Sequence, residues 1–122
     1  MRSPCPLANA LDLLGDRWTL LVLRDLFMGK RRFGDFLESP EKIATNILSE
    51  RLRRLEEAGL VEKRRYQERP PREEYRLTSR GAETLPIIQA AVRWANRHIP
   101  DTWQPPESLA SMTPEQWLKS QS

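Results

Sequence analysis

The chain has 122 residues, of which 39% are hydrophobic and 30% charged, and its formal net charge is +3. This length and composition fit one soluble globular domain and exclude a disordered or membrane-embedded chain. No apolar run is long enough to cross a bilayer and no signal peptide is recognisable, so we expect a cytoplasmic protein with no membrane partner.

The charge distribution and two rare residue types narrow the function classes further. Residues 100–122 carry a net charge of −2 and the remainder +5, which favours, though only weakly, a polyanionic partner for the basic part. Cys5 is the only cysteine and His98 the only histidine. One chain therefore holds no disulfide, no Cys/His metal site and no Ser-His-Asp triad, and we expect no metal, no cofactor and no enzymatic activity.

Capping residues predict two helices at the start of the chain. Pro6 suits the first position of a helix, which makes Cys5 its N-cap, and Gly15 ends it. Asp16 is a typical cap for a second helix, and Gly29 is the expected stop of that helix.

Two more helices follow a basic connection, or one-bridge strand, at 30–33. The first starts at Gly34, buries Phe36 and Leu37, and stops at 39–40, because the residue before a proline avoids the helical conformation. The second covers about 45–58 and ends where a glycine supplies a left-handed stop. Its buried side is a leucine stripe at helical spacing, formed by Leu48, Leu52 and Leu55.

The second half of the chain predicts a β-hairpin and a long helix. Strands at 60–66 and 74–77 flank a polar loop that two prolines keep extended. Thr78 caps a helix that reaches about His98, inside which Pro86 predicts either a bend or a late start.

Two helices joined by a tight turn and followed by a hairpin are typical of a winged helix-turn-helix. We therefore predict a mainly α fold with a small β-hairpin (α+β), dimerised through its terminal helices. Residues 1–99 form the DNA-binding domain and include the dimerisation helices. Residues 100–122 form a tail: a loop to about 112, then a short helix that starts at Thr113-Pro114 and carries Trp117 and Leu118. We expect the tail to belong to the dimer interface.

One side of the helix at 45–58 has the composition of a DNA-reading surface. On a helical wheel, the residues that face away from the leucines are Asn46, Ser49, Glu50, Arg53 and Glu57. Thr45, Asn46 and Ser49 are short polar residues near the N-terminal end of the helix, and with Arg53 they are the candidates for DNA contact. Short side chains let a helix backbone approach the major groove, where asparagine pairs with adenine and arginine with guanine or phosphate. An ordinary solvent-facing side is the alternative for the helix alone, and the neighbouring short helix and hairpin favour the DNA interpretation.

Basic residues outside this helix are candidates for phosphate contacts. Arg69 and Arg72 flank the two prolines at the hairpin tip, and a stiff tip loses little entropy on a phosphate ridge or in a minor groove. Arg31 and Arg32 lie beside the preceding short helix. For the hairpin, the alternative is an exposed segment with balanced charges. For the arginines before the short helix, the alternative is a solvated turn, and there both interpretations carry equal weight.

A heptad-like seam on the long helix predicts dimerisation. Its members are spaced by three and four residues: Leu85, Ile88, Val92, Ala95 and Ile99. Two heptads are fewer than a coiled coil needs, so packing within the domain is the alternative. Ala91 and Trp94 widen the apolar face beyond what so small a domain covers, and we predict a homodimer. Its further members are Leu7 and Leu11 of the first helix and Trp103 and Trp117 of the tail.

An ordered series of motifs resembles the HxlR-type winged-helix regulators, relatives of the MarR-like repressors. The motifs are Cys5-Pro6, LLGDRWTLL at 13–21, RRF at 31–33, IATNILSERL at 43–52, LEEAGLV at 55–61 and PPREEYRLT at 70–78. The resemblance covers about residues 5–98. It implies a dimer that binds inverted-repeat operators, with the helix at 45–58 in the major groove and the hairpin as wing. Ala44 stands where many such regulators have a serine or threonine cap, so we expect one phosphate contact fewer.

The resemblance also makes Cys5 a candidate sensor, since some members of the family sense electrophiles or oxidants through a cysteine at this position. The positive end of a helix favours a thiolate there. Pairing of that thiol with its symmetry mate, or with a small thiol, would shift the recognition helices. An inert, half-buried thiol that only caps and packs is the alternative.

Together these observations predict a homodimeric, sequence-specific transcriptional regulator, most simply a repressor, that binds double-stranded DNA and responds through Cys5 or a small-molecule effector. Trp18 and Trp94 are candidate walls of an effector pocket between the first two helices and the long helix. The alternative is that both tryptophans belong to the core. A winged-helix module that binds protein instead of DNA is the alternative function. An enzyme with a site shared across a dimer is a remote third.

Overall fold

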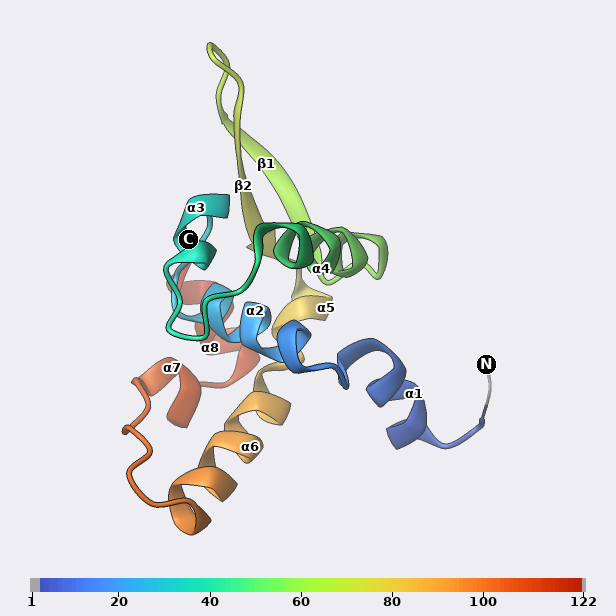
Figure 1. The fold of residues 1–122 in the computed structure, drawn as a ribbon, viewed down its shortest axis with the longest axis vertical. Coiled ribbons are helices and arrows are strands. Elements are labelled where there is room, and N and C mark those ends of the chain that lie inside the picture. Colours follow the sequence, from blue (N-terminus) through green and yellow to red (C-terminus); the bar gives the residue numbers. More distant parts are fainter. Residues whose placement is uncertain (1–2, 122) are drawn as a thin grey trace.

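The computed structural model describes residues 3–121 and shows a mainly helical chain with one antiparallel hairpin. The elements are α1 (Pro6–Leu14), α2 (Arg17–Phe27), α3 (Phe33–Leu37), α4 (Thr45–Glu57), β1 (Val61–Gln67), β2 (Arg72–Leu77), α5 (Ser79–Ala82), α6 (Leu85–His98), α7 (Glu107–Ala110) and α8 (Pro114–Ser120). The hairpin, called the wing below, projects from the body beside α4, while α1 and α6 extend away from it in two other directions (Figure 1). This arrangement confirms the predicted winged-helix fold class.

The first two helices are capped as the sequence predicts. Cys5 occupies the N-cap position of α1, although its side chain makes no capping hydrogen bond, and Gly15 is the C-cap. The Asp16 carboxylate caps α2 by accepting from the N–H groups of Trp18 and Thr19 at 2.9 and 3.1 Å. The cap satisfies two of the amides that the start of a helix leaves without an intrahelical partner.

The connection between α2 and α3 is not a strand, so of the two alternatives for residues 30–33, a plain connection is correct. A single backbone hydrogen bond of 2.7 Å, from the N–H of Tyr75 in β2 to the carbonyl of Arg31, ties the connection to the wing. α3 starts at Phe33, one residue earlier than predicted, and buries Phe36 completely. The prediction that Leu37 is buried is wrong, because a five-residue helix turns only one narrow side to the core.

The leucine stripe of α4 is the centre of the core. Leu48, Leu52 and Leu55 are at most 1% exposed and join buried residues of the other elements. Gly59 follows the helix with φ +79°, the left-handed conformation that glycine adopts at little cost. The inner side of α4 is therefore anchored, and its outer side is left for other contacts.

The predicted long helix is divided in two, and the late start is the correct alternative. The Thr78 hydroxyl caps the short α5 by accepting from the N–H of Gly81 at 3.0 Å, and α6 begins anew at Leu85 with Pro86 in its first turn. A Cβ added at Gly81 would lie 2.0 Å from the carbonyl oxygen of Leu60. α5 and the base of the wing are therefore in backbone contact, which only glycine at this position permits.

The tail folds back onto its own chain. A short helix, α7, interrupts the segment predicted to be a loop, while α8 begins at Pro114 with a capping box, as its sequence signal predicts. Leu109 and Trp117 are buried, and the indole N–H of Trp117 donates to the carbonyl of Phe27 at 2.9 Å. Trp117 is thus a core residue of the single chain, which corrects its assignment to an interface. None of the helices in residues 3–121 is long and apolar enough to cross a membrane.

Candidate nucleic-acid interface

The outer edge of α4 carries all four residues that the sequence singles out for reading DNA. Thr45 and Asn46 lie in the first turn, Ser49 one turn later and Arg53 one turn after that, and all four are exposed. The buried leucines pack the opposite side of the same helix against the core, so this edge faces away from the core. The structure therefore brings the four side chains onto one accessible polar strip.

Arg53 is engaged with two carboxylates of its own helix. Its Nη1 lies 2.6 Å from Oε1 of Glu57 and its Nη2 3.6 Å from Oε1 of Glu50. Exposed ion pairs at this spacing contribute only about 0.3–0.5 kcal/mol each. A guanine edge or a phosphate can therefore take the place of these carboxylates at small cost.

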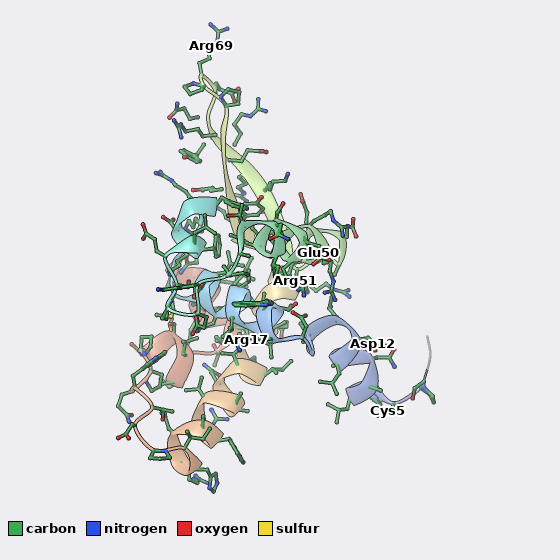
Figure 2. The ribbon with its side chains drawn as sticks, viewed as in Figure 1. Cys5, Asp12, Arg17, Glu50, Arg51 and Arg69 are labelled. Atoms are coloured by element: carbon green, nitrogen blue, oxygen red, sulfur yellow. The ribbon has the colours of Figure 1, made fainter. Side chains whose placement is uncertain are left out.

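The other edge of α4 is fixed to the body by two arginines. Arg51 donates from Nε to Oδ1 of Asp16 at 2.9 Å, and Nη1 of Arg54 lies 3.7 Å from the second oxygen of that carboxylate. Arg54 also donates to the backbone carbonyls of Asp12 and Leu13, at 3.4 and 3.5 Å. In Figure 2, Arg51 lies on the side of α4 that faces α2. These contacts set the position of α4 relative to the turn between α1 and α2.

Asp16 has a second role that the sequence alone does not reveal. Its partial burial disfavours the carboxylate, but hydrogen bonds from Arg51, from the Thr19 hydroxyl and from two backbone N–H groups outweigh that effect and hold the pKa of Asp16 well below its ordinary value. The bond to Asp16 in turn raises the pKa of Arg51. The sequence signal for this role is the position of Arg51, which lies directly beside the leucine stripe on a helical wheel.

The basic residues of the wing lie in two different environments. Along the strands, the register sets Arg64 and Arg65 each opposite a glutamate, so their charges are compensated. At the tip Arg69 and Arg72 are exposed, and the register sets Arg72 opposite the neutral Gln67. Within residues 3–121, neither tip arginine takes part in an ion pair. Figure 2 shows Arg69 at the far end of the wing, which is where the uncompensated positive charge lies.

The two arginines before α3 differ in their surroundings. Arg32 is exposed, and its guanidinium lies 4.3 Å from the ring centroid of Tyr66 in the wing, a cation–π contact. Arg31 is half-buried and donates to the side-chain oxygen of Gln121, beyond the end of α8. Burial and the nearby charge of Arg76 lower the pKa of Arg31. Arg32 therefore belongs to the exposed surface around the wing, whereas Arg31 lies at its base under the tail.

The predicted dimer residues divide into a buried and an exposed set. Leu85 and Ile88 are 0% and 5% exposed in the single chain, which corrects their assignment to an interface, because this stripe of α6 faces α2 and the core. Val92 and Ala95 are half-buried. Large apolar side chains that remain exposed on α1, on α6 and just after it are Leu7, Leu11, Ile87, Trp94, Ile99 and Trp103.

The Cys5 thiol is exposed at the start of α1, so the alternative of a half-buried thiol is wrong (Figure 2). A separate apolar groove of about 250 Å³ lies between α2 and α6, and Trp103 is among its lining residues. Neither Trp18 nor Trp94, the predicted walls of an effector pocket, lines this groove. In the described part of the chain, no three His, Cys, Asp or Glu side chains come together as metal ligands.

Comparison with known proteins assigns these features to a family. The family model described as HxlR-like helix-turn-helix matches residues 13–102. The HTH-type transcriptional regulator sll1512 of Synechocystis is 45% identical over 86 residues, which cover 70% of this chain but only 64% of that relative. The match therefore spans less than two thirds of the relative's length.

Solved structures show the same fold. The structure of PA1607, a candidate transcription factor, superposes with a TM-score of 0.75 at 38% identity and covers 85% of this chain and 73% of that one. The redox regulator HypR in its oxidised form superposes with a TM-score of 0.71 at 32% identity, covering 77% and 97% of the two chains. The family match ends at residue 102, so α7 and α8 lie outside it.

Proposed function

Since the chain belongs to the HxlR-like helix-turn-helix family, whose members are transcriptional regulators and not enzymes, we propose that it binds an inverted-repeat DNA operator as a homodimer. The observation that carries the proposal is the outer edge of α4: polar, exposed and backed by a helix side that the core and Asp16 hold in place. A dimer bound to its operator excludes the polymerase from the same DNA, so repression in the cytoplasm is the simplest outcome.

Each candidate residue has a distinct role in this proposal. Asn46 pairs with adenine and Arg53 with guanine in the major groove, while the short side chains of Thr45 and Ser49 let the backbone of α4 approach the bases. Arg32 and the wing-tip residues Arg69 and Arg72 contact phosphates or the adjacent minor groove. Phosphate contacts position the protein and the α4 contacts supply the sequence preference.

The homodimer is supported by the exposed apolar side chains of α1 and α6. Leu7 and Leu11 are 66% and 55% exposed and Trp94 is 61% exposed, a large apolar surface for so small a chain. If a second copy covers this apolar surface, the resulting dimer can place its two α4 helices on one DNA duplex. We expect Leu11→Glu to convert a dimer to a monomer by light scattering, whereas a wild-type chain that is monomeric at all concentrations contradicts this step.

The proposal is tested by selection of bound sequences from a pool of random DNA duplexes. The expected result is an inverted repeat whose half-sites lie roughly 10 base pairs apart, or a multiple of that, with affinity that falls steeply as salt rises. If the protein enriches no duplex, the alternative function stands, that of a winged-helix module that binds another protein.

A response to oxidants through Cys5 is the second part of the proposal. The thiol is exposed, and this chain is similar to a regulator described as a redox regulator. In this reaction two Cys5 thiols, one from each copy, form one disulfide, and diamide takes up the two electrons and two protons. We expect diamide to change operator affinity in the wild type but not in Cys5→Ser. An equal response in both proteins removes Cys5 from the mechanism.

A further inference from the structure

A small pocket lies at the base of the wing, where the α2–α3 connection, the hairpin and the tail meet. Its volume is about 90 Å³, and we call it the wing-base pocket. Its lining consists of Arg31, Glu62, Arg64, Arg76, Leu77, Trp117, Leu118 and Gln121. An ordered water needs roughly 10–15 Å³, so the pocket has room for a group of several non-hydrogen atoms.

The charges around the wing-base pocket are unbalanced. Its lining holds three arginines and one glutamate. Arg64 pairs with Glu62 at 3.1 Å, and Arg76 pairs with a glutamate of its own strand at 2.7 Å. Among the described residues, Arg31 has no carboxylate within ion-pair distance and donates instead to the neutral amide oxygen of Gln121. One cation in the pocket therefore lacks an anionic partner.

The environment of Arg31 makes its positive charge less favourable than in water. Burial removes hydration from the guanidinium and Arg76 repels it, and both effects lower the pKa of Arg31, only partly offset by Glu74. An anion in the pocket would relieve the repulsion and replace the lost hydration. Guanidinium groups bind carboxylate and phosphate oxygens through paired hydrogen bonds, which are shorter and stronger than bonds to a neutral amide.

We propose that the wing-base pocket binds a small oxyanion, a phosphate or a carboxylate, held by Arg31 with Arg76 as the second cationic wall. Three members of its lining, Trp117, Leu118 and Gln121, lie in the tail, beyond the residues that the family model matches. The other five lining residues lie within the matched range, so the pocket forms where the shared domain meets the tail. The backbone carbonyl of Arg31 is bonded to β2, so the occupant lies next to the joint between α3 and the wing.

The first experiment measures thermal unfolding of the full chain in inorganic phosphate and in chloride, at equal pH and ionic strength and without DNA. We expect a saturable rise of Tm with phosphate in the wild type, because a ligand that binds only the folded state stabilises it. Arg31→Gln should abolish the rise. Arg97→Gln, which removes an exposed arginine of α6 outside the pocket, should keep it. No saturable rise in the wild type, or an equal rise in Arg31→Gln, overturns the proposal.

A second variant guards against a folding defect in Arg31→Gln. Gln121→Glu keeps the shape of the side chain and places a carboxylate against Arg31. We expect this built-in anion to raise Tm in chloride and to remove the effect of phosphate. If Gln121→Glu is stabilised by phosphate as strongly as the wild type, the pocket does not hold the anion and the proposal fails.

A third measurement separates the two sources of the oxyanion, a free small molecule and a DNA backbone phosphate. If Arg31→Gln lowers affinity for the selected operator and reduces the salt slope by about one, the anion comes from DNA. Unchanged operator binding with loss of the phosphate effect assigns the site to a free anion. Because the melting experiments contain no DNA, their result is independent of the proposed operator binding.

Discussion

The two edges of α4 carry the same residue type in opposite circumstances. Arg53 is 57% exposed; its ion pair with Glu57 is solvent-exposed, and its pair with the half-buried Glu50 is long, at 3.6 Å. Arg51, two positions earlier, is 21% exposed and bonded to the helix cap Asp16. The side of the leucine stripe on which an arginine lies decides its role: Arg51 is on the side that contacts Asp16, and Arg53 is on the other side. One helix thus divides into a reading edge and a fixing edge, both of which depend on the buried leucines between them.

Removal of the shared support should have the largest effect. Leu52→Ala leaves a cavity under both edges, and we expect unfolding free energy to fall by about 2–5 kcal/mol. Chemical denaturation measures it. Operator binding should fall in proportion to the unfolded fraction only, with the base preference of the folded protein unchanged. A loss below about 0.5 kcal/mol would contradict the central position of this leucine.

On the reading edge, Arg53→Ala should weaken operator binding by about 1–3 kcal/mol, because a guanine contact in the major groove is lost. Thermal unfolding should stay near the wild-type value, since the ion pairs that disappear are exposed. Fluorescence anisotropy with the selected operator measures the affinity. A variant that binds as tightly as the wild type would place the reading edge elsewhere.

On the fixing edge, Arg51→Met should lower unfolding free energy by about 1 kcal/mol while the base preference persists. If Arg51→Met and Arg53→Ala lose base preference to the same extent, the claim that only the reading edge contacts bases is contradicted. Denaturation and duplex selection on the same preparations provide the comparison.

The fixing edge also predicts a pH dependence. Because the pKa of Asp16 is lowered in the folded chain, its ionised form stabilises the fold. That stabilisation is complete above the ordinary aspartate pKa of about 4, and it is lost progressively as the pH falls below that value. Denaturation at pH 5 and pH 3 should show a smaller loss in Asp16→Asn than in the wild type. Identical losses would show that the carboxylate is not coupled to folding.

The wing tip should give the smallest effect. Arg69→Gln removes an exposed charge that contacts phosphate, so we expect a weakening of a few-fold on all duplexes alike and a salt slope lower by about one. Arg65→Gln, at a strand position opposite a glutamate, is the matched control and should change the slope less. A change in base preference at Arg69 would instead assign the tip to base reading.

Local signals predicted most of the fold. The caps at Asp16 and Thr78, the stop at Gly59 and the leucine stripe of α4 all depend on neighbours a few positions away, and the structure confirms each of them. For the same reason, the sequence alone places Asn46, Ser49 and Arg53 on one exposed side of a helix.

Long-range packing explains what the sequence did not predict. An apolar pattern does not show whether its own chain or a second copy covers it, so the sequence predicts Trp117 and Leu85 at an interface, whereas both lie in the core. The sequence pairs Arg31 with its neighbour Arg32, but the partner of Arg31 in the structure, Gln121, is 90 positions away along the chain. The role of Arg51 likewise depends on a carboxylate 35 positions away.

The most direct test of the reading edge is the base preference of the wild type and of Asn46→Ala, determined by selection from the same pool of random duplexes. We expect the preference to relax at one symmetric pair of positions, at an adenine in each half-site, while the remaining positions and the half-site spacing persist. An identical preference in both proteins would contradict the claim that the outer edge of α4 reads DNA.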